Sequence, residues 1–455
     1  MGSQDPLRGY EGRLRDILER LDVRIGDRLR IIKGNTIFEG ILMPKTAESG
    51  KDILVLKLPN GYNVGIGIDE GVRIEVLERR GLKLYEEILG EETYIKGESD
   101  KLITIISTGG TIASRVEYET GAVRPALSAH DLVDLVPDLL KLGSIKALSL
   151  FSIFSEDMTP SHWSRIAEQV AKYIYEGADG VIIAHGTDTM AYTAAALAFA
   201  LRNLPVPVAL VGAQRSSDRP STDALINLKG AAITVIKAPF AEVTVVMHGD
   251  VSDTYVLAHR GVKVRKMHSS RRDAFQSIND LPLAKVIPET NELIMINNTY
   301  IKRTNDKSSL ILMNKFDDRV VLIKAYPGID PEIIDMVVDR GYRGIVIEGT
   351  GLGHIANRCI PSIRRAIEEG IPVIMTTQTL FGKINMNVYT TGRRLLAAGV
   401  IPGYDMLPET AYVKLSWVLA QTRDLCEVRR LMLTNFVYEF NERHLPYHYP
   451  RWFHG

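Results

Sequence analysis

Two short segments combine hydroxyl, carboxylate and glycine residues in a way that suits chemistry at the end of a strand. Residues 107–111 (STGGT) come directly after the apolar run LITII, and residues 185–190 (HGTDTM) come directly after GVIIA. Two glycines allow a tight turn and a close approach of the backbone to a ligand. Threonine hydroxyls become nucleophiles when a base or a proton relay activates them. One interpretation of these segments is therefore a site for a polar ligand with hydroxyl-based chemistry.

Each segment also has a purely structural interpretation. The first is equally typical of a strand end that is followed by a capped helix or a hairpin. In the second, Thr187 or Asp188 would be the N-cap of the following helix, since both residue types are common caps. Taken singly, neither segment decides between the two interpretations.

The elements around these segments predict a sheet that would bring them together. From Leu102, short apolar runs alternate with helical stretches, and this βαβα order is typical of a parallel sheet covered by helices. In such a sheet, ligands bind at the carboxyl ends of the strands. One helix is well marked, with Thr159 as N-cap, Pro160 at its first position and Gly177 at its end.

A second, smaller α/β unit is predicted near the end of the chain. After an irregular region, residues 252–318, the βα order resumes with VVLIKA, DPEIIDMVVDRG, GIVIEG, PSIRRAIEEG and PVIMTT. Two or three helices then finish the chain, at 391–399, 408–421 and 424–435.

The N-terminal part differs in character from both α/β units. Residues 10–22 have leucine and isoleucine at helical spacing and predict a short amphipathic helix. Residues 23–79 contain four or five short alternating runs, separated by turns such as Lys33-Gly34-Asn35 and Asn60-Gly61. Such a pattern favours a small β-barrel of the SH3 or Sm type.

The predicted fold class is α/β, with two parallel-sheet domains preceded by a small β-barrel. The β module is expected at residues 23–80, after a tail with a short helix at 1–22. A linker at 81–100 leads to the first α/β domain, which carries the site, at 101–300. A second linker at 301–320, the second α/β domain at 321–440 and a tail at 441–455 complete the chain.

Composition excludes several classes of protein. The 455 residues include 45% apolar and 24% charged residues, which is ordinary for a globular chain. Lys+Arg and Asp+Glu both number 55, so the chain as a whole has no electrostatic preference for nucleic acid or an anionic membrane. Two cysteines without metal-ligand spacing argue against a disulfide scaffold or a zinc site. No apolar stretch is long enough to span a membrane and no signal core is evident, so we expect a cytoplasmic protein without a metal.

Taken together, TGGTIAS and HGTDTM about 75 residues later resemble the signature pair of the bacterial-type L-asparaginase/glutaminase family. Other segments resemble that family in the same order, over about residues 101–435. These are FSEDM, which resembles its substrate-binding loop, GAQR, which resembles its GAxR segment, and RKMHSSRRDAF, which resembles the segment that carries its catalytic lysine.

The resemblance implies a role for each matching residue. Thr111 resembles the primary nucleophile, which attacks the side-chain amide carbon of the substrate. A second group, in which lysine and aspartate position and activate a threonine or a water, is implied for Thr187, Asp188 and Lys266. Substrate binding is implied for the lid tyrosine Tyr118, and for Ser155 and Glu156 with Asp188 at the α-carboxylate and α-amino groups. An amide substrate also needs donors for its oxyanion, and backbone N–H groups of the turn around Gly110 (residues 109–111) or near Thr187 would suit this role.

The basic run at residues 260–272 has three interpretations. A lysine that acts as a base must be neutral for part of the time, and burial and neighbouring positive charge favour its neutral form. The run contains six Lys and Arg residues and no Asp or Glu, so it would supply such charge around Lys266. It would equally suit an RNA-facing patch or a solvated surface loop.

The N-terminal extension narrows the resemblance to one branch of the family. Roughly 100 residues precede the TGGT strand, and together with YETG and SEDM this arrangement resembles the D subunits of archaeal glutamyl-tRNA(Gln) amidotransferases. The resemblance implies a glutaminase that supplies ammonia to the E subunit, a partner that uses ATP and Mg²⁺ to amidate Glu-tRNA(Gln). It implies no cofactor in this chain, tRNA contact mainly through the partner, and a homodimer within a heterotetramer. The sequence has no GxxxxGK[ST] loop, in keeping with ATP binding elsewhere.

Other functions stay open at this point. A free cytoplasmic L-asparaginase with an accessory β domain would carry the same motifs, and the sequence does not decide between glutamine and asparagine. A dinucleotide-binding enzyme is suggested by GTGLG at residues 349–353, although the spacing is not GxGxxG. The β module would either pack against the partner or bind nucleic acid.

Overall fold

The structure is a computed structural model. It describes residues 7, 9–45, 50–58, 62–69, 71–79, 92–109, 114–116, 123–125, 138–215, 221–304 and 306–449. The turn Asn60-Gly61 and the candidate site residues Gly110, Thr111 and Tyr118 lie outside these ranges.

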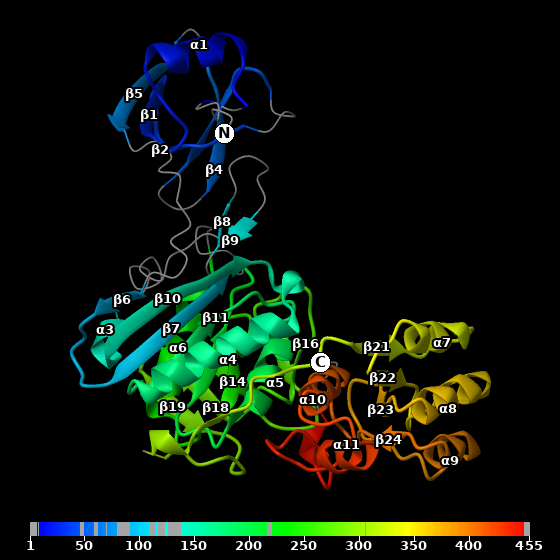
Figure 1. Cartoon of the computed structure of the whole chain (residues 1–455). Coiled ribbons are helices and arrows are strands. Elements are labelled where there is room, and N and C mark those ends of the chain that lie inside the picture. Colours follow the sequence, from blue (N-terminus) through cyan, green and yellow to red (C-terminus); the bar gives the residue numbers. More distant parts are fainter. Residues whose placement is uncertain are drawn as a thin grey trace.

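The N-terminal unit is a helix followed by a five-stranded antiparallel sheet, which stands apart from the α/β body (Figure 1). Helix α1 (Gly12–Arg20) buries Leu14 and Leu18, as its spacing predicts. The sheet has the order β4-β3-β2-β1-β5, with β4 and β5 as its edges. Gly34 and Asn35 make the predicted two-residue turn, since Lys33 pairs with Thr36. The strands are β1 (Arg28–Lys33), β2 (Thr36–Leu42), β3 (Ile53–Lys57), β4 (Asn63–Gly67) and β5 (Arg73–Glu78).

The second unit is built on a nine-stranded sheet of the order β19-β18-β15-β14-β13-β11-β7-β10-β6. Its strands are β6 (Glu92–Ile95), β7 (Leu102–Gly109), β10 (Ser144–Ile153), β11 (Gly180–Ala184), β13 (Val208–Val211), β14 (Val243–His248), β15 (Val256–Arg260), β18 (Ala284–Ile287) and β19 (Glu292–Met295). The five strands from β14 to β10 are parallel, as predicted. The strands at both edges are antiparallel, so the sheet is mixed.

The antiparallel edges have a simple cause. Strands β14 and β15 are joined by only seven residues, 249–255, and a connection this short suits antiparallel neighbours. At the other edge, Glu92–Ile95 lies within the segment expected as a linker, residues 81–100. It forms β6 instead, because the alternation of Thr93 and Ile95 against exposed residues suits an edge strand beside β10.

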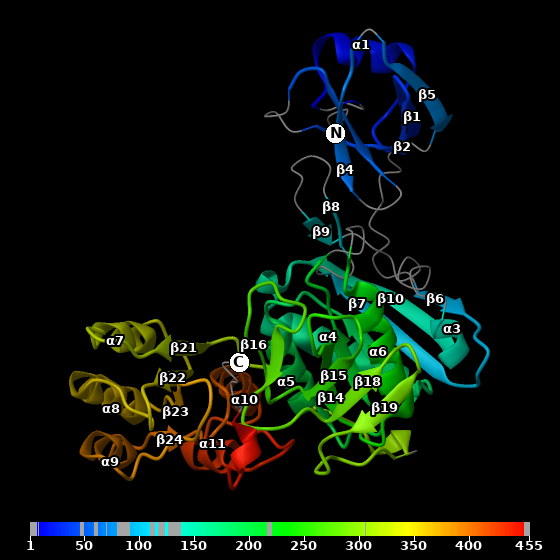
Figure 2. The same ribbon diagram turned by 180° about the vertical axis from the view of Figure 1, so that it is seen from behind.

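Helices cover both faces of this sheet (Figures 1 and 2). Val181 and Ile183 point into a core shared with α4 (Pro160–Tyr175) and α5 (Met190–Ala200), whereas Ile182 and Ala184 point into a second core beneath α6 (Ala224–Lys237). A strand buried on both faces explains the continuous apolar run GVIIA. Helix α4 begins after Thr159 with Pro160, and Gly177 follows its end with a φ of 112°, as predicted. The short helix α3 (Leu139–Leu142) precedes β10.

The third unit is a four-stranded parallel sheet of the order β21-β22-β23-β24. Its strands are β21 (Val320–Lys324), β22 (Gly344–Gly349), β23 (Val373–Thr377) and β24 (Ile401–Pro402). Helices α7 (Glu332–Asp339), α8 (Ile360–Glu368) and α9 (Thr390–Ala397) share a core on one face. On the other face, α10 (Pro408–Leu419) shares the core of α4 and α5, so it joins the two α/β units. Helix α11 (Leu425–Met432) follows, and the three final helices match the predicted segments.

Short elements complete the description. Strand pairs are β8 (Ser114–Val116) with β9 (Val123–Pro125), β12 (Leu201–Arg202) with β20 (Ile311–Leu312), and β16 (Val264–Lys266) with β17 (Phe275–Ser277). The 3-10 helices are η2 (Ser155–Asp157), η3 (Lys307–Ser309), η4 (Asn357–Cys359) and η5 (Pro446–His448). None of the helices in the described ranges is long and apolar enough to cross a membrane.

Candidate active site

The two signature segments begin side by side, at the carboxyl ends of two central strands of the large sheet. Strands β7 and β11 are parallel neighbours, and Ser107 pairs with Ala184 at their carboxyl ends. Just beyond, the buried Thr108 donates a hydrogen bond from its hydroxyl to the Ala184 carbonyl, at 3.0 Å. This contact ties the start of the TGGT turn to the start of HGTDTM. Thr108 is thus a structural residue. Thr111, three residues further on, is outside the described ranges.

Lys266 links a threonine and an aspartate of the HGTDTM segment. Its ammonium nitrogen donates to the Thr187 hydroxyl oxygen at 2.9 Å and to Asp188 Oδ1 at 2.7 Å. The Thr187 residue is buried, the Lys266 side chain is 14% exposed and the Asp188 side chain is 67% exposed. The three predicted residues of the second catalytic group are therefore in direct contact, and the Asp188 carboxylate lies on the solvent-exposed side of this group, called the open side below.

The chain reaches Lys266 through a small hairpin. Lys266 is the last residue of β16 and pairs with Phe275 of β17, whose ring is fully buried in the core shared with α5. The hairpin is therefore anchored by apolar packing on one side while the lysine projects from its end. A hydroxyl and an amine that are 2.9 Å apart can exchange a proton, which is the arrangement that activates a threonine or a water.

Gly212 of the GAQR segment makes room for Thr187. A Cβ atom at Gly212 would lie 2.8 Å from Thr187 Cγ2, 2.7 Å from Met190 Cε and 2.9 Å from the His185 carbonyl oxygen. Such distances are below van der Waals contact, so only glycine fits here without displacing the HGTDTM segment. The end of β13 is therefore part of the support of Thr187.

Ser155 lies against the same segment. Thr189 donates from its hydroxyl to the Ser155 carbonyl oxygen at 2.5 Å. A Cβ at Gly186 would meet Ser155 Cβ at 2.7 Å, so the two loops are in close contact. Ser155 is buried, whereas Glu156, the next residue in η2, is exposed. The structure thus brings Ser155 to the site and leaves the Glu156 carboxylate on its solvent side.

His185 supports the site in a way that the motif alone does not reveal. It is fully buried, and burial lowers its pKa to about 4, so the ring is neutral. Its Nδ1–H donates to the Gly186 carbonyl at 2.7 Å, and its Nε2 accepts from the Thr193 hydroxyl at 2.9 Å. Trp163 in turn donates to Thr193 Oγ1 at 3.2 Å. This chain of three hydrogen bonds connects α4 to the backbone just before Thr187.

A second buried network holds the GAQR segment. The carboxylate of Asp223, fully buried, accepts from the backbone N–H groups of Gln214 and Arg215 at 2.9–3.0 Å. Asn227 donates to the Gly212 carbonyl at 3.0 Å and is linked through its Oδ1 to His248. Asp223 is not among the residues that the motifs predict. Its only sequence signal is its place just before helix α6, where an acidic residue is typical of a simple cap.

The basic run at residues 260–272 is not a free patch, and only its residues 268–271 form an exposed loop. Arg260 and Lys263 are buried, which contradicts both expectations for these two residues. Carboxylates from outside the run face each of its basic side chains, in the pairs Arg260 with Glu242 and Asp280, Lys263 with Asp405, Arg265 with Glu409, Lys266 with Asp188, Arg271 with Asp273, and Arg272 with Asp253. The charged group in contact with Lys266 is therefore the Asp188 carboxylate, whereas the sequence suggests that other cations of the run surround this lysine.

The GTGLG segment has no dinucleotide-binding geometry. It follows β22, but Thr350 forms a bridge with His354, so the chain turns back at once. A Rossmann turn leads directly into a helix whose N-terminus binds the pyrophosphate, whereas α8 begins only at Ile360. In the described parts of the chain, no group of three His, Cys, Asp or Glu residues is placed to hold a metal ion.

Three family models match the chain in succession. The GatD N-terminal domain matches residues 23–77, the N-terminal domain of asparaginase matches residues 102–300, and the glutaminase/asparaginase C-terminal domain matches residues 319–432. These ranges correspond to the small antiparallel sheet, to the nine-stranded sheet apart from its edge strand β6, and to the four-stranded sheet.

Individual proteins resemble the chain over most of its length. The D subunit of the glutamyl-tRNA(Gln) amidotransferase of Sulfurisphaera tokodaii is 52% identical over 98% of both chains, and that of Pyrococcus horikoshii is 55% identical over 94% of this chain and 97% of its own. Among solved structures, the thermostable L-asparaginase from Thermococcus kodakarensis is 34% identical with a TM-score of 0.67, and L-asparaginase I from Vibrio cholerae is 30% identical with a TM-score of 0.66. Each of the two matches 75% of this chain and 100% of its own length. The chain therefore belongs to the family of D subunits of glutamyl-tRNA(Gln) amidotransferase, an amidotransferase family, and its two α/β units are of the asparaginase type.

Proposed function

We propose that this chain is the glutaminase component of a tRNA-dependent amidotransferase. It hydrolyses the side-chain amide of glutamine, or of asparagine, and supplies ammonia to the E subunit. That partner would use ATP and Mg²⁺ to amidate Glu-tRNA(Gln), and would make most of the contact with the tRNA. The observation that carries the proposal is the contact of Lys266 with both Thr187 and Asp188 at the end of β11.

The chemistry is an acyl transfer in two steps. The Thr111 hydroxyl oxygen attacks the amide carbon, its proton passes to the amide nitrogen, and ammonia leaves as the acyl–threonine ester forms. Water then attacks the ester, and the carboxylic acid and free threonine are regenerated. Backbone N–H groups near Gly110 would stabilise the oxyanion in both steps. Neutral Lys266 would accept a proton through the Thr187 hydroxyl, at the observed separation of 2.9 Å.

Substrate binding is assigned to the groups that line the open side of this arrangement. The exposed carboxylates of Asp188 and Glu156 suit the α-amino group of an amino acid, because both carry negative charge near the site. Ser155 lies against Gly186 and suits the α-carboxylate. Tyr118 would close over the nucleophile as part of a lid.

The assembly is proposed as a homodimer of this chain with two copies of the E subunit, in the cytoplasm. The D-subunit relatives named above are parts of an amidotransferase, and this chain matches them over nearly its whole length, the N-terminal domain included. A free asparaginase with an accessory β domain is the second candidate. It is favoured by one observation, namely that two L-asparaginases match the α/β units over their whole length.

Substitution of the nucleophile tests the proposal. Thr111→Ala should abolish ammonia release from glutamine, while Thr111→Ser, which keeps a hydroxyl, should retain measurable turnover. Thr290→Ala is the matched control, because it removes the hydroxyl of an exposed threonine in the turn between β18 and β19 and should leave the rate unchanged. Near-full activity of the Thr111→Ala chain would refute the nucleophile assignment.

A further inference from the structure

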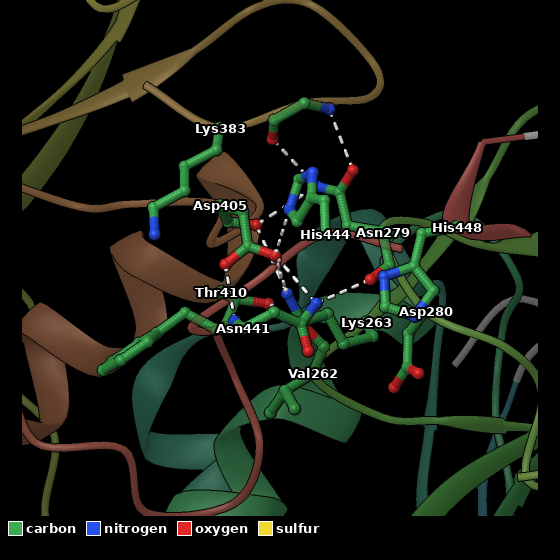
Figure 3. Close-up of polar contacts among 12 residues, drawn as sticks. Val262, Lys263, Asn279, Asp280, Lys383, Asp405, Thr410, Asn441, His444 and His448 are labelled. Carbon is green, nitrogen blue, oxygen red and sulfur yellow. Dashed lines mark hydrogen bonds and ion pairs between the residues drawn. The ribbon is translucent and has the colours of Figure 1, made fainter. Parts of the chain in front are cut away.

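A buried carboxylate of the C-terminal α/β unit accepts four hydrogen bonds (Figure 3). The Asp405 side chain is fully buried and lies between β24 and α10. Lys263 Nζ donates to it at 2.8 Å, His444 Nε2 at 3.0 Å, and Asn441 through both its backbone N–H at 2.7 Å and its side-chain Nδ2 at 2.9 Å. Lys263 Nζ also lies 3.4 Å from the backbone carbonyl oxygen of Asp405. The four residues of this cluster come from three separate parts of the chain.

Lys263 connects this cluster to Lys266, because the two lysines are close in sequence. It directly precedes β16, which ends at Lys266. The Lys263 side chain is fully buried, so its ammonium group has no access to solvent and depends on Asp405. Removal of the carboxylate charge would leave a buried cation uncompensated, which is among the costly defects in a protein interior.

Two further contacts attach the same strand to the start of helix α10. The Thr410 hydroxyl donates to the Val262 carbonyl at 2.9 Å, and Arg265 Nε lies 3.2 Å from the Glu409 carboxylate. Strand β16 is thus fixed before and within its length by residues of the C-terminal α/β unit. The position of Lys266 is set by this docking together with the hairpin.

The returning side of the hairpin is held by the same cluster. Asn279 follows β17, and its carbonyl oxygen accepts from Asn441 Nδ2 at 2.6 Å. Its side chain exchanges two hydrogen bonds with the backbone of Gly382, at 3.1 and 2.8 Å. Asn441 therefore touches both Asp405 and the segment after β17, and it bridges the two ends of the hairpin that carries Lys266.

The segment that supplies these donors is the C-terminal one, residues 441–444. Lys383 Nζ donates to the Glu442 carbonyl at 3.2 Å, which fastens this segment to the loop after β23. A buried carboxylate is stable only when its acceptor positions are filled. Burial by itself would raise the pKa of Asp405, but the charge of Lys263 and the hydrogen bonds from His444 and Asn441 outweigh it and hold the pKa at about 2. The carboxylate therefore stays charged beside Lys263.

We propose that Asn441 and His444 are positioning residues of the catalytic site. Asn441 and His444 hold the Asp405 carboxylate, Asp405 holds Lys263, and Lys263 sets the strand that presents Lys266 to Thr187. This inference rests on the proposed function, because it concerns the placement of the lysine in that reaction. Asn441 and His444 form their hydrogen bonds with Asp405 and Asn279 and not with Thr187, Asp188 or Lys266, so they act as positioning residues. Their loss should act on the rate of the chemical step.

The test is the steady-state rate of ammonia release by the full-length chain, in the form in which the wild type is active. In the double variant Asn441→Ala/His444→Ala, we expect kcat to fall about 10- to 100-fold, the usual cost of displacing a catalytic group by about 1 Å. KM should change by less than about twofold, because the binding residues are on other loops. The single variant His444→Gln keeps an N–H donor toward Asp405 and should retain most of the wild-type kcat.

A matched control is available in the same segment. Arg443 is exposed and adjacent to His444, so Arg443→Ala should leave kcat and KM unchanged. Each variant is assayed below its melting temperature, and a crystal structure of the double variant gives the distance from Lys266 Nζ to Thr187 Oγ1. An increase of this distance together with the lower kcat supports the inference.

Two results would overturn it. The first is a double variant with wild-type kcat, and the second is a reduced kcat with the distance still at 2.9 Å. Failure of the proposed function is a different outcome, because then the wild-type chain itself would release no ammonia from glutamine or asparagine in any form.

Discussion

The ammonium nitrogen of Lys266 lies 2.9 Å from the hydroxyl oxygen of Thr187, although the two residues are 79 positions apart in the chain. A hydrogen bond of this length can run in either direction. A protonated lysine donates to the hydroxyl oxygen, whereas a neutral lysine accepts the hydroxyl proton. The same geometry therefore serves both the resting state and the state in which Lys266 acts as a base.

Removal of that amine should stop catalysis without unfolding the chain. In Lys266→Ala, the loss of a general base should lower kcat by about 10²- to 10⁴-fold. The Asp188 carboxylate that is left behind is mostly exposed and stays solvated, so the melting temperature should change little. The exposed Arg271, on the loop of the same hairpin, gives the control Arg271→Ala. A Lys266→Ala chain with a wild-type rate and an unchanged pH–rate profile would remove the lysine from the mechanism.

The close approach at Gly212 predicts a strong effect of one methyl group. In Gly212→Ala, the new Cβ would meet Thr187 Cγ2 at 2.8 Å and push the threonine away from Lys266. Overpacking of this kind costs about 1–3 kcal/mol of stability, and the displaced hydroxyl should lower kcat. Gly67→Ala is the matched control, since only the tip of Lys33 lies near that Cβ, at 3.6 Å. Equal kcat values for the two variants would show that Thr187 does not need this space.

Two buried histidines make stability depend on pH. Burial lowers the pKa of His185 to about 4 and that of His259 to about 3, from the ordinary value of 6.5. The unfolded chain binds protons below pH 6.5 and the folded chain does not, so the free energy of unfolding falls as the pH falls from 6.5 toward 4 and 3. Between about pH 7 and pH 5, each histidine should account for about 2 kcal/mol.

Urea unfolding at neutral and at mildly acidic pH, about 7 and about 5, measures this effect. The variant His185→Gln keeps a donor and an acceptor but does not titrate, so its stability should differ less between the two pH values than that of the wild type. The same difference in both proteins would mean that His185 is protonated in the folded chain at the lower pH.

Two truncated chains, one with and one without the edge strand β6, should differ in stability. Glu92 accepts hydrogen bonds from Lys172 at 2.7 Å and from the hydroxyl of the buried Tyr173 at 2.9 Å. A chain that begins at residue 92 keeps these contacts, whereas one that begins at residue 101 leaves the Tyr173 hydroxyl without its acceptor. The loss should cost about 1–3 kcal/mol. Equal melting temperatures for the two truncated chains would contradict this role of Glu92.

The chain that begins at residue 92 also tests the role of the small β domain. Without residues 1–91, the chain should still hydrolyse glutamine at its basal rate, since the candidate site lies in the α/β units. Assembly with the E subunit, or turnover that depends on tRNA, should be lost to a greater extent. An equal loss of both activities would mean that the β domain is an integral part of the catalytic core.

Much of the fold can be predicted because strands and helices carry strong local patterns. The run GVIIA is apolar at every position, which predicts a strand buried on both faces, and Val181 and Ile182 do lie in different cores. The antiparallel edges cannot be predicted in the same way. Glu92–Ile95 is too short and too polar to distinguish from a linker without its partner β10.

The grouping of Lys266 with Thr187 and Asp188 follows from the family motifs alone. The supporting residues are harder to find, because nothing local marks them. His185, Asp223 and Asp405 act through partners that are distant in sequence, and a buried polar residue shows its role only when those partners are known. The pairing of the basic run with carboxylates is hidden from the sequence for the same reason.

The most direct test of the account is ammonia release from glutamine and from asparagine by the full-length chain, alone and with the E subunit, ATP and Glu-tRNA(Gln). The account predicts slow hydrolysis by the isolated chain and a marked increase with the complete system, which Thr111→Ala abolishes. Fast hydrolysis of asparagine by the chain alone, unaffected by the partner and by tRNA, would contradict it and identify a free asparaginase.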